Sequence, residues 1–281
     1  MRNILCVTLI ALLGGCTSTS VTEKYQDKRN DIINVKDKVI EFETGNVLIG
    51  SVSRLYMSNK CLLIADHKSV DKQIHIFNKN DFSYLTSIGN FGEGPEEITV
   101  MGCLAIDEAH HQLYVSDHAK QKIFSYDMDS VMVDSLYKPQ VKTAMNETLF
   151  PSEYQYINDT LSIAVLIKPT STSTFNQFLG RWNMNTGEMI PMKYTHPDIQ
   201  KKRITFAASE KAGIYVECYT RHDLMTICSL DGELLYNIYG PDWDGGNGNK
   251  LQSFGTVMIG NDKIFVSYCG EDYARDSFPT K

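Results

Sequence analysis

The sequence predicts an all-β protein built as a β-propeller of four-stranded antiparallel blades. Three observations predict this fold. A short apolar pattern returns five times at a spacing of about 50 residues, which is typical of stacked supersecondary units. Each copy is rich in β-branched and aromatic residues and is too short for a helix. Asn, Asp and Gly stand where hairpin turns are expected. The copies are Leu62–Asp66, Leu113–Asp117, Leu161–Val165, Ile214–Cys218 and Ile264–Tyr268.

Each copy has a strand-like run before it and two more after it, which together make a four-stranded blade. The preceding runs are 54–58, 102–106, 153–157, 203–207 and 255–259. The third runs are 74–77, 123–126, 178–182 and 224–227, and the fourth runs are expected to end near Ile88, Tyr137, Tyr194 and Tyr239. We therefore expect blades near 45–97, 98–150, 151–200 and 201–250, with a partial blade at 251–281.

About five readable blades, the last incomplete, predict a propeller that is truncated or incompletely closed. A six-bladed ring at about 50 residues per blade needs about 300 residues, more than this chain provides. The exposed edge strands of such a ring would favour pairing or aggregation.

Composition limits the class of protein. The chain has 281 residues, 42 % of them hydrophobic and 22 % charged, which is too hydrophobic for a disordered protein and too mixed for a polytopic membrane protein. The formal net charge of −7 argues against a nucleic-acid-binding surface, which needs clustered Lys and Arg.

The N-terminus has the features of an export signal. Arg2 precedes an apolar run, 4–13, that would span about 15 Å as a helix, half of a hydrocarbon core. Leu13-Gly-Gly-Cys16 resembles the lipobox of bacterial lipoproteins, which implies a signal peptide at 1–15 and a lipid on Cys16. The polar segment 16–36 is expected to be a lipidated, flexible tether before the propeller domain at 37–281. Thr17 stands where many inner-membrane lipoproteins have Asp, which favours the outer membrane, on its periplasmic side rather than its surface.

Blades 1 and 2 carry a family resemblance. Its residues are Ser87–Ile98, Leu104–Asp107, Leu113–Asp117 and Lys122–Asp127. They resemble the lipoprotein family of six-bladed, TolB-like β-propellers, which overlaps the NHL-type propellers. Asp66 and Asp117 match the strand-end Asp of that family, whereas the later blades have Val165, Cys218 and Tyr268 there. The resemblance implies a fold and a cell-envelope compartment, and it implies no reaction.

Few residues point to chemistry, and no catalytic, cofactor-binding or metal-ligating residue is assigned. His110, His111 and His118 lie close in sequence, but adjacent strand residues face opposite sides and no Cys or carboxylate has zinc-like spacing, so a solvated turn is favoured. The glycines of Gly92-Glu-Gly-Pro95 could expose N–H groups to an anion, but the segment precedes a strand rather than a helix N-terminus. An inter-blade turn is therefore favoured.

The cysteines and one loop complete the candidates. Cys218 and Cys228 are the pair that neighbouring strands could bring together, although most buried cysteines behave as small apolar residues. Asp242, Trp243 and Asp244 open a Gly- and Asn-rich insertion, and exposed aromatic residues often anchor ligands, sugars included. A flexible inter-blade loop is the alternative.

The features together predict a non-catalytic binding or scaffold module, anchored to the membrane through its N-terminal lipid. Its partner would be a glycan, a peptide or another envelope protein, and no cofactor is expected. The alternative is a metal-dependent hydrolase similar to the gluconolactonase-type propellers, which hold a divalent metal in the central channel with Glu, Asn and Asp. The runs expected to line that channel contain few carboxylates, which disfavours this alternative.

Overall fold

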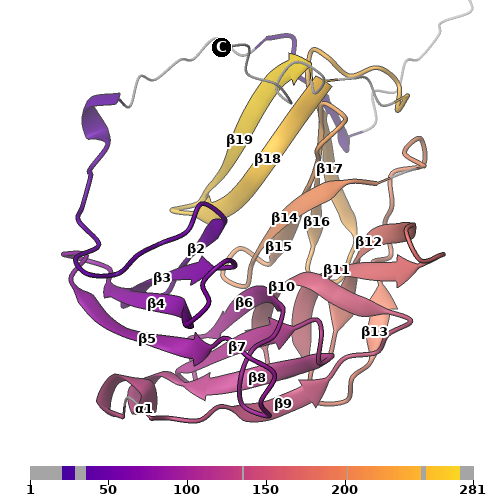
Figure 1. The fold of residues 1–281 in the computed structure, drawn as a ribbon. Helices are drawn as coiled ribbons and strands as arrows, with labels where there is room; N and C mark the ends of the chain where they lie inside the picture. The colour runs from indigo at the N-terminus through magenta and orange to yellow at the C-terminus, as the bar shows by residue number, and fades with distance from the viewer. Residues whose placement is uncertain (1–20, 29–35, 135, 201, 248–250, 273–281) are drawn as a thin grey trace, which may run out of the picture.

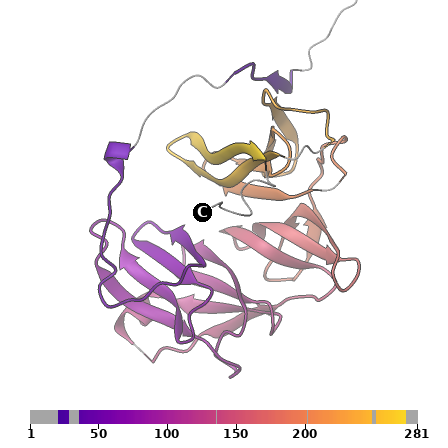
Figure 2. The ribbon, with the colours of Figure 1, turned by 45° about the horizontal axis from the view of Figure 1, so that its top comes forward.

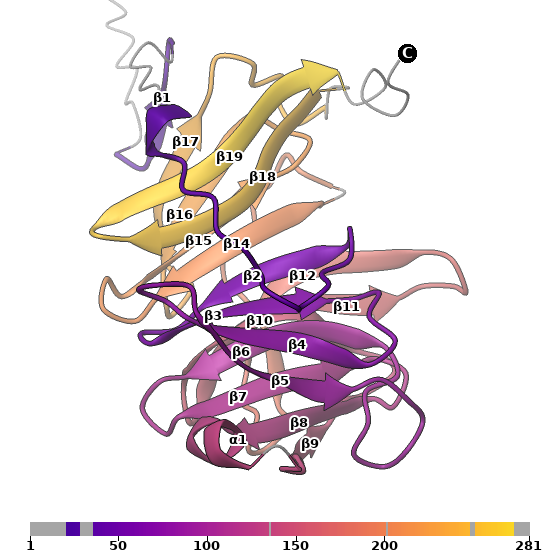
Figure 3. The same ribbon diagram turned by 60° about the vertical axis from the view of Figure 1, so that its left-hand side comes forward.

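The computed structural model describes residues 21–28, 36–134, 136–200, 202–247 and 251–272. The predicted signal peptide, Cys16 and residues 273–281 lie outside these ranges. The described chain forms five sheets, and within each sheet the consecutive strands of one blade form an antiparallel meander (Figure 1 and Figure 3). No helix among the described residues has the length and apolar character needed to cross a membrane.

The sheets correspond to the expected blades. Blade 1 contains β2 (Ser53–Met57), β3 (Cys61–Asp66), β4 (Lys72–Asn78) and β5 (Tyr84–Asn90). Blade 2 contains β6 (Met101–Asp107), β7 (Gln112–Asp117), β8 (Lys122–Asp127) and β9 (Gln140–Ala144). Blade 3 contains β10 (Phe150–Asn158), β11 (Leu161–Pro169), β12 (Phe175–Trp182) and β13 (Met189–Pro191). Blade 4 contains β14 (Ile204–Ser209), β15 (Ile214–Tyr219), β16 (Leu224–Ser229) and β17 (Leu234–Tyr239), and blade 5 contains β18 (Leu251–Gly260) and β19 (Lys263–Asp272).

The five sheets stand around a common centre (Figure 2). The first strands of neighbouring blades contact one another there, β6 with β10, β10 with β14 and β14 with β18. The five copies of the repeated pattern lie in β3, β7, β11, β15 and β19, the second strand of each sheet. The predicted all-β fold with four-stranded antiparallel blades is therefore confirmed, and the fifth blade has two strands among the described residues.

The core lies between the blades, because each sheet packs face to face with its neighbour. All six residues of β3 are buried, since both faces of this strand are covered. Leu63 and Ala65 pack against blade 2, whereas Leu62 and Ile64 face the side of blade 1 that has no neighbouring sheet.

A segment that precedes blade 1 covers this free face. Val47 and Ile49 pack on Leu62 and Ile64. The ring of Phe42 stacks on Phe82 with ring centres 4.5 Å apart. The free face of the first blade is thus buried without a sheet beside it.

The fourth strands of blades 2 and 3 differ from expectation. The run that was expected to end near Tyr137 contains the helix α1 (Met128–Val133), and the strand follows it as β9. The side chain of Asp127 caps the helix by accepting a hydrogen bond from the Ser130 N–H at 2.7 Å, and Val131 is buried beneath it. In blade 3, β13 ends at Pro191, before the expected Tyr194.

Part of the segment that was expected to be a flexible tether forms a strand, β1 (Glu23–Tyr25). This strand pairs in parallel with β17 and adds a fifth strand to the sheet of blade 4. The Tyr25 ring stacks on the Tyr239 ring at 4.7 Å. The expectation of an unstructured tether is wrong for these residues, and a short 3-10 helix, η1 (Lys36–Lys38), follows at the end of the segment.

Blade 5 consists of two strands among the described residues, so β19 has no partner strand on its outer edge there. Met258 and Phe265, which face away from blade 4, have exposed side chains. Association or aggregation through this edge stays a prediction.

Candidate functional site

The meander topology gives the ring two different ends. The connection between the first and second strands of each blade, and that between its third and fourth strands, lie at one end, which we call the turn end. The second-to-third-strand turns and the loops between blades lie at the other, which we call the loop end. The candidate residues divide between these ends.

A cavity of about 360 Å³ opens between blades 1 and 2 at the turn end. Its walls are mainly apolar and come from both sheets and from α1; the apolar lining residues are Leu63, Leu85, Ile106, Leu113, Met128 and Met132. Met128 and Met132 are four residues apart, which places both on the same face of α1. The helix that replaces a tight hairpin in blade 2 therefore forms one wall of the cavity.

Charged and polar groups form the rim. Lys60, Asn78, Glu108, His111 and Asp129 all border the cavity. The Glu108 carboxylate accepts a hydrogen bond from the Asn59 N–H at 2.7 Å, which links the two blades beside the opening. His111 Nδ1 lies 2.8 Å from a carboxylate oxygen of Asp129. His111 itself has a φ of 53°, in the left-handed region that few non-glycine residues adopt.

Cys61 also borders the cavity, and its environment does not activate it. Cys61 is 7 % exposed, and burial raises the pKa of its thiol. Because the thiolate is the nucleophilic form, a raised pKa keeps this cysteine inert at neutral pH. The cavity thus has the features of a binding site: apolar walls, few polar groups and a volume within the range of small-ligand pockets.

The predicted ligand loop lies at the loop end, and its tryptophan packs inward. The Trp243 ring is 5.0 Å from the ring of Tyr239 and 5.5 Å from that of His196. Asp242 is exposed and accepts a hydrogen bond from the Tyr268 hydroxyl at 3.2 Å, which connects the loop to blade 5. The geometry gives Trp243 a packing role; ligand binding by Asp242, Trp243 and Asp244 stays a prediction.

Two buried histidines support this loop. His222 contacts the Trp243 ring and lies 4.0 Å from a carboxylate oxygen of Asp244. His196 accepts or donates a hydrogen bond with the Tyr239 hydroxyl at 2.9 Å. Burial lowers the pKa of both imidazoles, so both are neutral at pH 7.

The Gly92–Pro95 segment is an inter-blade turn, as expected. The Lys120 ammonium donates hydrogen bonds to the carbonyl oxygens of Gly94 and Glu97, both at 2.6 Å. The Glu97 carboxylate accepts from the Gly94 N–H at 2.8 Å. The carbonyl groups of this loop thus bind a cation, the Lys120 ammonium, and the Gly94 N–H already donates to the Glu97 carboxylate. The loop therefore does not form a phosphate-binding site.

Cys218 and Cys228 do not form a disulfide. They pair with different partners across β15 and β16, Met225 for Cys218 and Tyr215 for Cys228. Cys218 packs toward blade 5 and Cys228 toward blade 3, on opposite faces of the sheet. Burial raises the pKa of Cys218 to about 12 and that of Cys228 to about 11.

The strands around the centre offer little for a channel metal. Among the described side chains of the five innermost strands, the carboxylates are Asp107 and Glu153. Glu153 accepts a charged hydrogen bond from Arg54 at 2.7 Å, which neutralises it. Asp107 stands at the turn end instead.

The histidines of blade 2 separate in space. His118 lies at the loop end, where its ring meets Phe150 and burial lowers its pKa. His110 and His111 lie in the turn between β6 and β7, as expected. The structure places two carboxylates beside His110 that the sequence analysis did not connect with it, those of Asp107 and Asp159. The sequence contains a signal for this arrangement. Asp107 is three residues before His110, and Asp159 holds a similar place, at the first turn of its blade, one repeat later.

Comparisons with known proteins agree with the fold. No curated protein matches the sequence. A Bacteroides fragilis protein described as exported is 14 % identical with a TM-score of 0.51, over 89 % of this chain and 73 % of that one. A DUF4221 member from Bacteroides vulgatus is 11 % identical with a TM-score of 0.49, and the match covers 65 % of this chain. This chain spans only 56 % of that protein.

The sequence profile of one family covers more than half of the chain. It matches residues 17–179, from the predicted tether to the third strand of blade 3, and it describes a propeller of six blades. The chain therefore belongs to the DUF5128 family of 6-bladed β-propellers.

Proposed function

We propose that this protein is a non-catalytic binding module of the cell envelope, and that its ligand enters the cavity between blades 1 and 2. The cavity is the observation that carries the proposal. Its walls are aliphatic and thioether side chains, which adapt to apolar groups of varied shape. Its rim offers both charge signs, through Lys60, Glu108 and Asp129, for the polar part of a ligand.

An apolar side chain of a peptide or of an envelope protein fits this site better than a glycan. Sugars bind against aromatic faces, and the aromatic candidate, Trp243, packs inward at the other end of the ring. The Asp242–Asp244 loop is then a support for the fold, and a glycan panel tests the remaining role assigned to it.

Membrane attachment is part of the proposal. The Leu13–Cys16 sequence supports lipidation of Cys16, which would place the propeller on the periplasmic side of the outer membrane, in the manner of the TolB-like lipoproteins. Replacement of Cys16 by Ser is expected to move the protein out of the membrane fraction. Protease added to intact cells distinguishes the two sides of the outer membrane. If the protein resists the protease, it lies on the periplasmic side; if it is cleaved, it lies on the cell surface.

The cavity is tested with the fluorescent apolar probe 1-anilinonaphthalene-8-sulfonate. Met132→Trp fills the cavity from α1, whereas Val133→Trp adds the same group one residue away, at a side chain that is 87 % exposed. We expect the first variant to weaken probe binding by about tenfold or more, since the bulk excludes the probe. The second is expected to bind as the wild type does.

Equal affinity in the wild type and both variants would contradict the proposed site. Enzyme-like turnover of lactone, glycoside or peptide substrates would contradict the non-catalytic assignment. Circular dichroism of both variants checks that their sheets are intact.

A further inference from the structure

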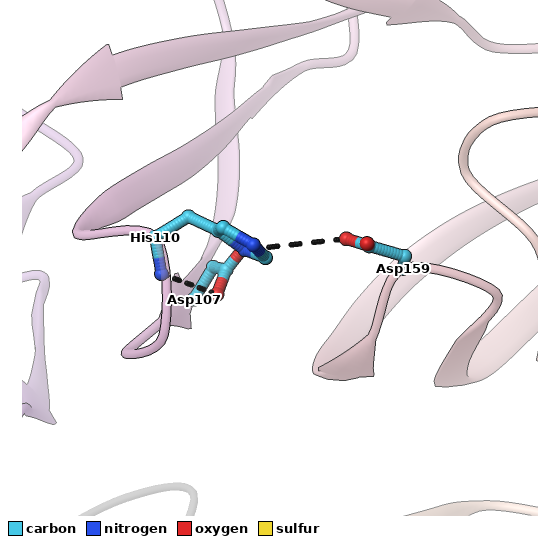
Figure 4. A group of neighbouring side chains, drawn as sticks. All are labelled: Asp107, His110 and Asp159. Atoms are coloured by element: carbon cyan, nitrogen blue, oxygen red, sulfur yellow. Dashed lines mark hydrogen bonds and ion pairs between the residues drawn. The ribbon is translucent and has the colours of Figure 1, made fainter.

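A group of metal-ligating side chains lies at the junction of blades 2 and 3 (Figure 4). One of its members, Asp107, also borders the cavity between blades 1 and 2. Asp107 ends β6, His110 follows in the β6–β7 turn, and Asp159 lies in the β10–β11 turn of the next blade. His110 Nδ1 is 2.8 Å from Asp107 Oδ2 and 4.0 Å from Asp159 Oδ1. One donor atom from each residue lies within 4.8 Å of the other two.

Both carboxylates are held in place by further hydrogen bonds. Asp107 is 1 % exposed; its Oδ1 accepts from the His110 N–H at 3.1 Å and its Oδ2 from the Tyr114 hydroxyl at 3.3 Å. Tyr156 donates its hydroxyl proton to Asp159 Oδ1 at 2.7 Å. Such outer partners orient the ligands of metal sites and raise their affinity.

The site is open toward solvent on one side. The side chains of His110 and Asp159 are 58 % and 65 % exposed, so an ion can enter and water can complete its coordination. Two carboxylates beside one imidazole give the site a net negative charge, which attracts a divalent cation.

We propose that Asp107, His110 and Asp159 bind a divalent transition-metal ion, with Zn²⁺ as the ion that best fits this donor set. One imidazole nitrogen with two carboxylate oxygens matches Zn²⁺, whereas Ca²⁺ and Mg²⁺ favour sites made of oxygen alone. Tetrahedral Zn²⁺ with bonds of about 2.0 to 2.2 Å needs donors about 3.3 Å apart, which the observed separations bracket. The exposed Asp159 carboxylate supplies the small movement required.

The ion would link the two blades. Asp107 and His110 belong to blade 2, and Asp159 belongs to blade 3, so one ion bridges turns that are separated by about one repeat. Three protein ligands leave a coordination position for water. Asp107 borders both sites, but His110 and Asp159 do not line the cavity, so Zn²⁺ binding does not require a ligand there.

Isothermal titration of the purified protein with Zn²⁺ alone tests the site. We expect one ion per chain in the wild type, and affinity weakened about 30-fold or more in His110→Ala and in Asp159→Asn, because each loses one of three ligands. His111→Ala is the matched control. This neighbouring histidine is also exposed, and among the described residues its ion-pair partner is Asp129, which is not a member of the proposed site. It is expected to keep wild-type affinity within about twofold.

Thermal unfolding gives an independent readout. Zn²⁺ is expected to raise the unfolding midpoint of the wild type and of His111→Ala, and to leave those of His110→Ala and Asp159→Asn unchanged, since an ion that binds only the folded state stabilises it. Absence of Zn²⁺ binding in the wild type would overturn the proposal. Binding that His111→Ala removes and His110→Ala retains would also overturn it.

Discussion

Replacement of Asp117 by Ala is expected to lower the free energy of unfolding by about 3 to 5 kcal/mol. The Asp117 carboxylate is fully buried at the end of β7. Its Oδ2 accepts a hydrogen bond from the Thr99 N–H at 2.8 Å. Its Oδ1 accepts from the N–H groups of Val100, Ala119 and Lys120 at 3.2, 3.0 and 3.2 Å. One side chain thus holds both the loop that leads into blade 2 and the next turn of that blade.

The magnitude follows from how many of these N–H groups water can reach. Val100 and Ala119 are exposed, so water can replace the lost acceptor there, whereas Thr99 and Lys120 are partly buried. A hydrogen bond to a charged group contributes about 1.5 to 3 kcal/mol, so two such losses give about 3 to 6 kcal/mol. The expected loss lies in the lower part of this interval, because local rearrangement lets water reach part of the freed groups.

Urea unfolding, followed by tryptophan fluorescence and circular dichroism, measures the change. Asp81→Ala is the control, because that exposed carboxylate accepts hydrogen bonds from Ser83 within its own turn and links no two blades among the described residues. Its unfolding midpoint is expected to stay close to that of the wild type. A loss below about 1 kcal/mol for Asp117→Ala would refute the view that this carboxylate holds the inter-blade loop.

Three further predictions concern packing and pH. Trp243→Ala is expected to cost about 2 to 3 kcal/mol, less than a fully buried aromatic residue, and an unchanged urea midpoint would show that the loop does not support the core. Phe42→Ala removes the stack on Phe82 and should lower the midpoint while leaving Zn²⁺ binding intact; loss of both together would contradict this. Burial lowers the pKa of His196 and His222 below 6.5, so the unfolded chain binds protons more readily than the folded protein does. The free energy of unfolding is therefore highest above pH 6.5 and falls as the pH drops below that value. Urea midpoints at pH 7.5 and 5.5 check this, and a higher midpoint at pH 5.5 would contradict it.

The strands were predictable because their signals are local and repeat. Leu62–Asp66 and its four counterparts show strand-like composition, and the turns between strands carry Asn, Asp or Gly. The α1 helix escaped this reasoning because six residues show no clear helical period, and the decisive contact is the cap from Asp127. The strand β1 escaped because its pairing depends on Asn237 and its neighbours, more than 200 residues away.

The candidate sites were harder to predict because each assembles residues from two blades. The cavity joins Leu63 and Leu85 of blade 1 to Met128 and Met132 of α1, which a single-blade pattern does not bring together. Asp159 reaches His110 only because blade 3 packs beside blade 2. Trp243 illustrates the reverse case, since a loop residue expected to be exposed is packed on Tyr239.

Methyl NMR of the protein labelled at its methionines tests the proposed binding site most directly. Met128 and Met132 line the cavity, whereas Met57 and Met258 are exposed on blades 1 and 5, at 59 % and 58 %. On addition of 1-anilinonaphthalene-8-sulfonate, a binding site between blades 1 and 2 predicts shifts in the resonances of Met128 and Met132. Shifts confined to Met57 or Met258, with Met128 and Met132 unmoved, would contradict it.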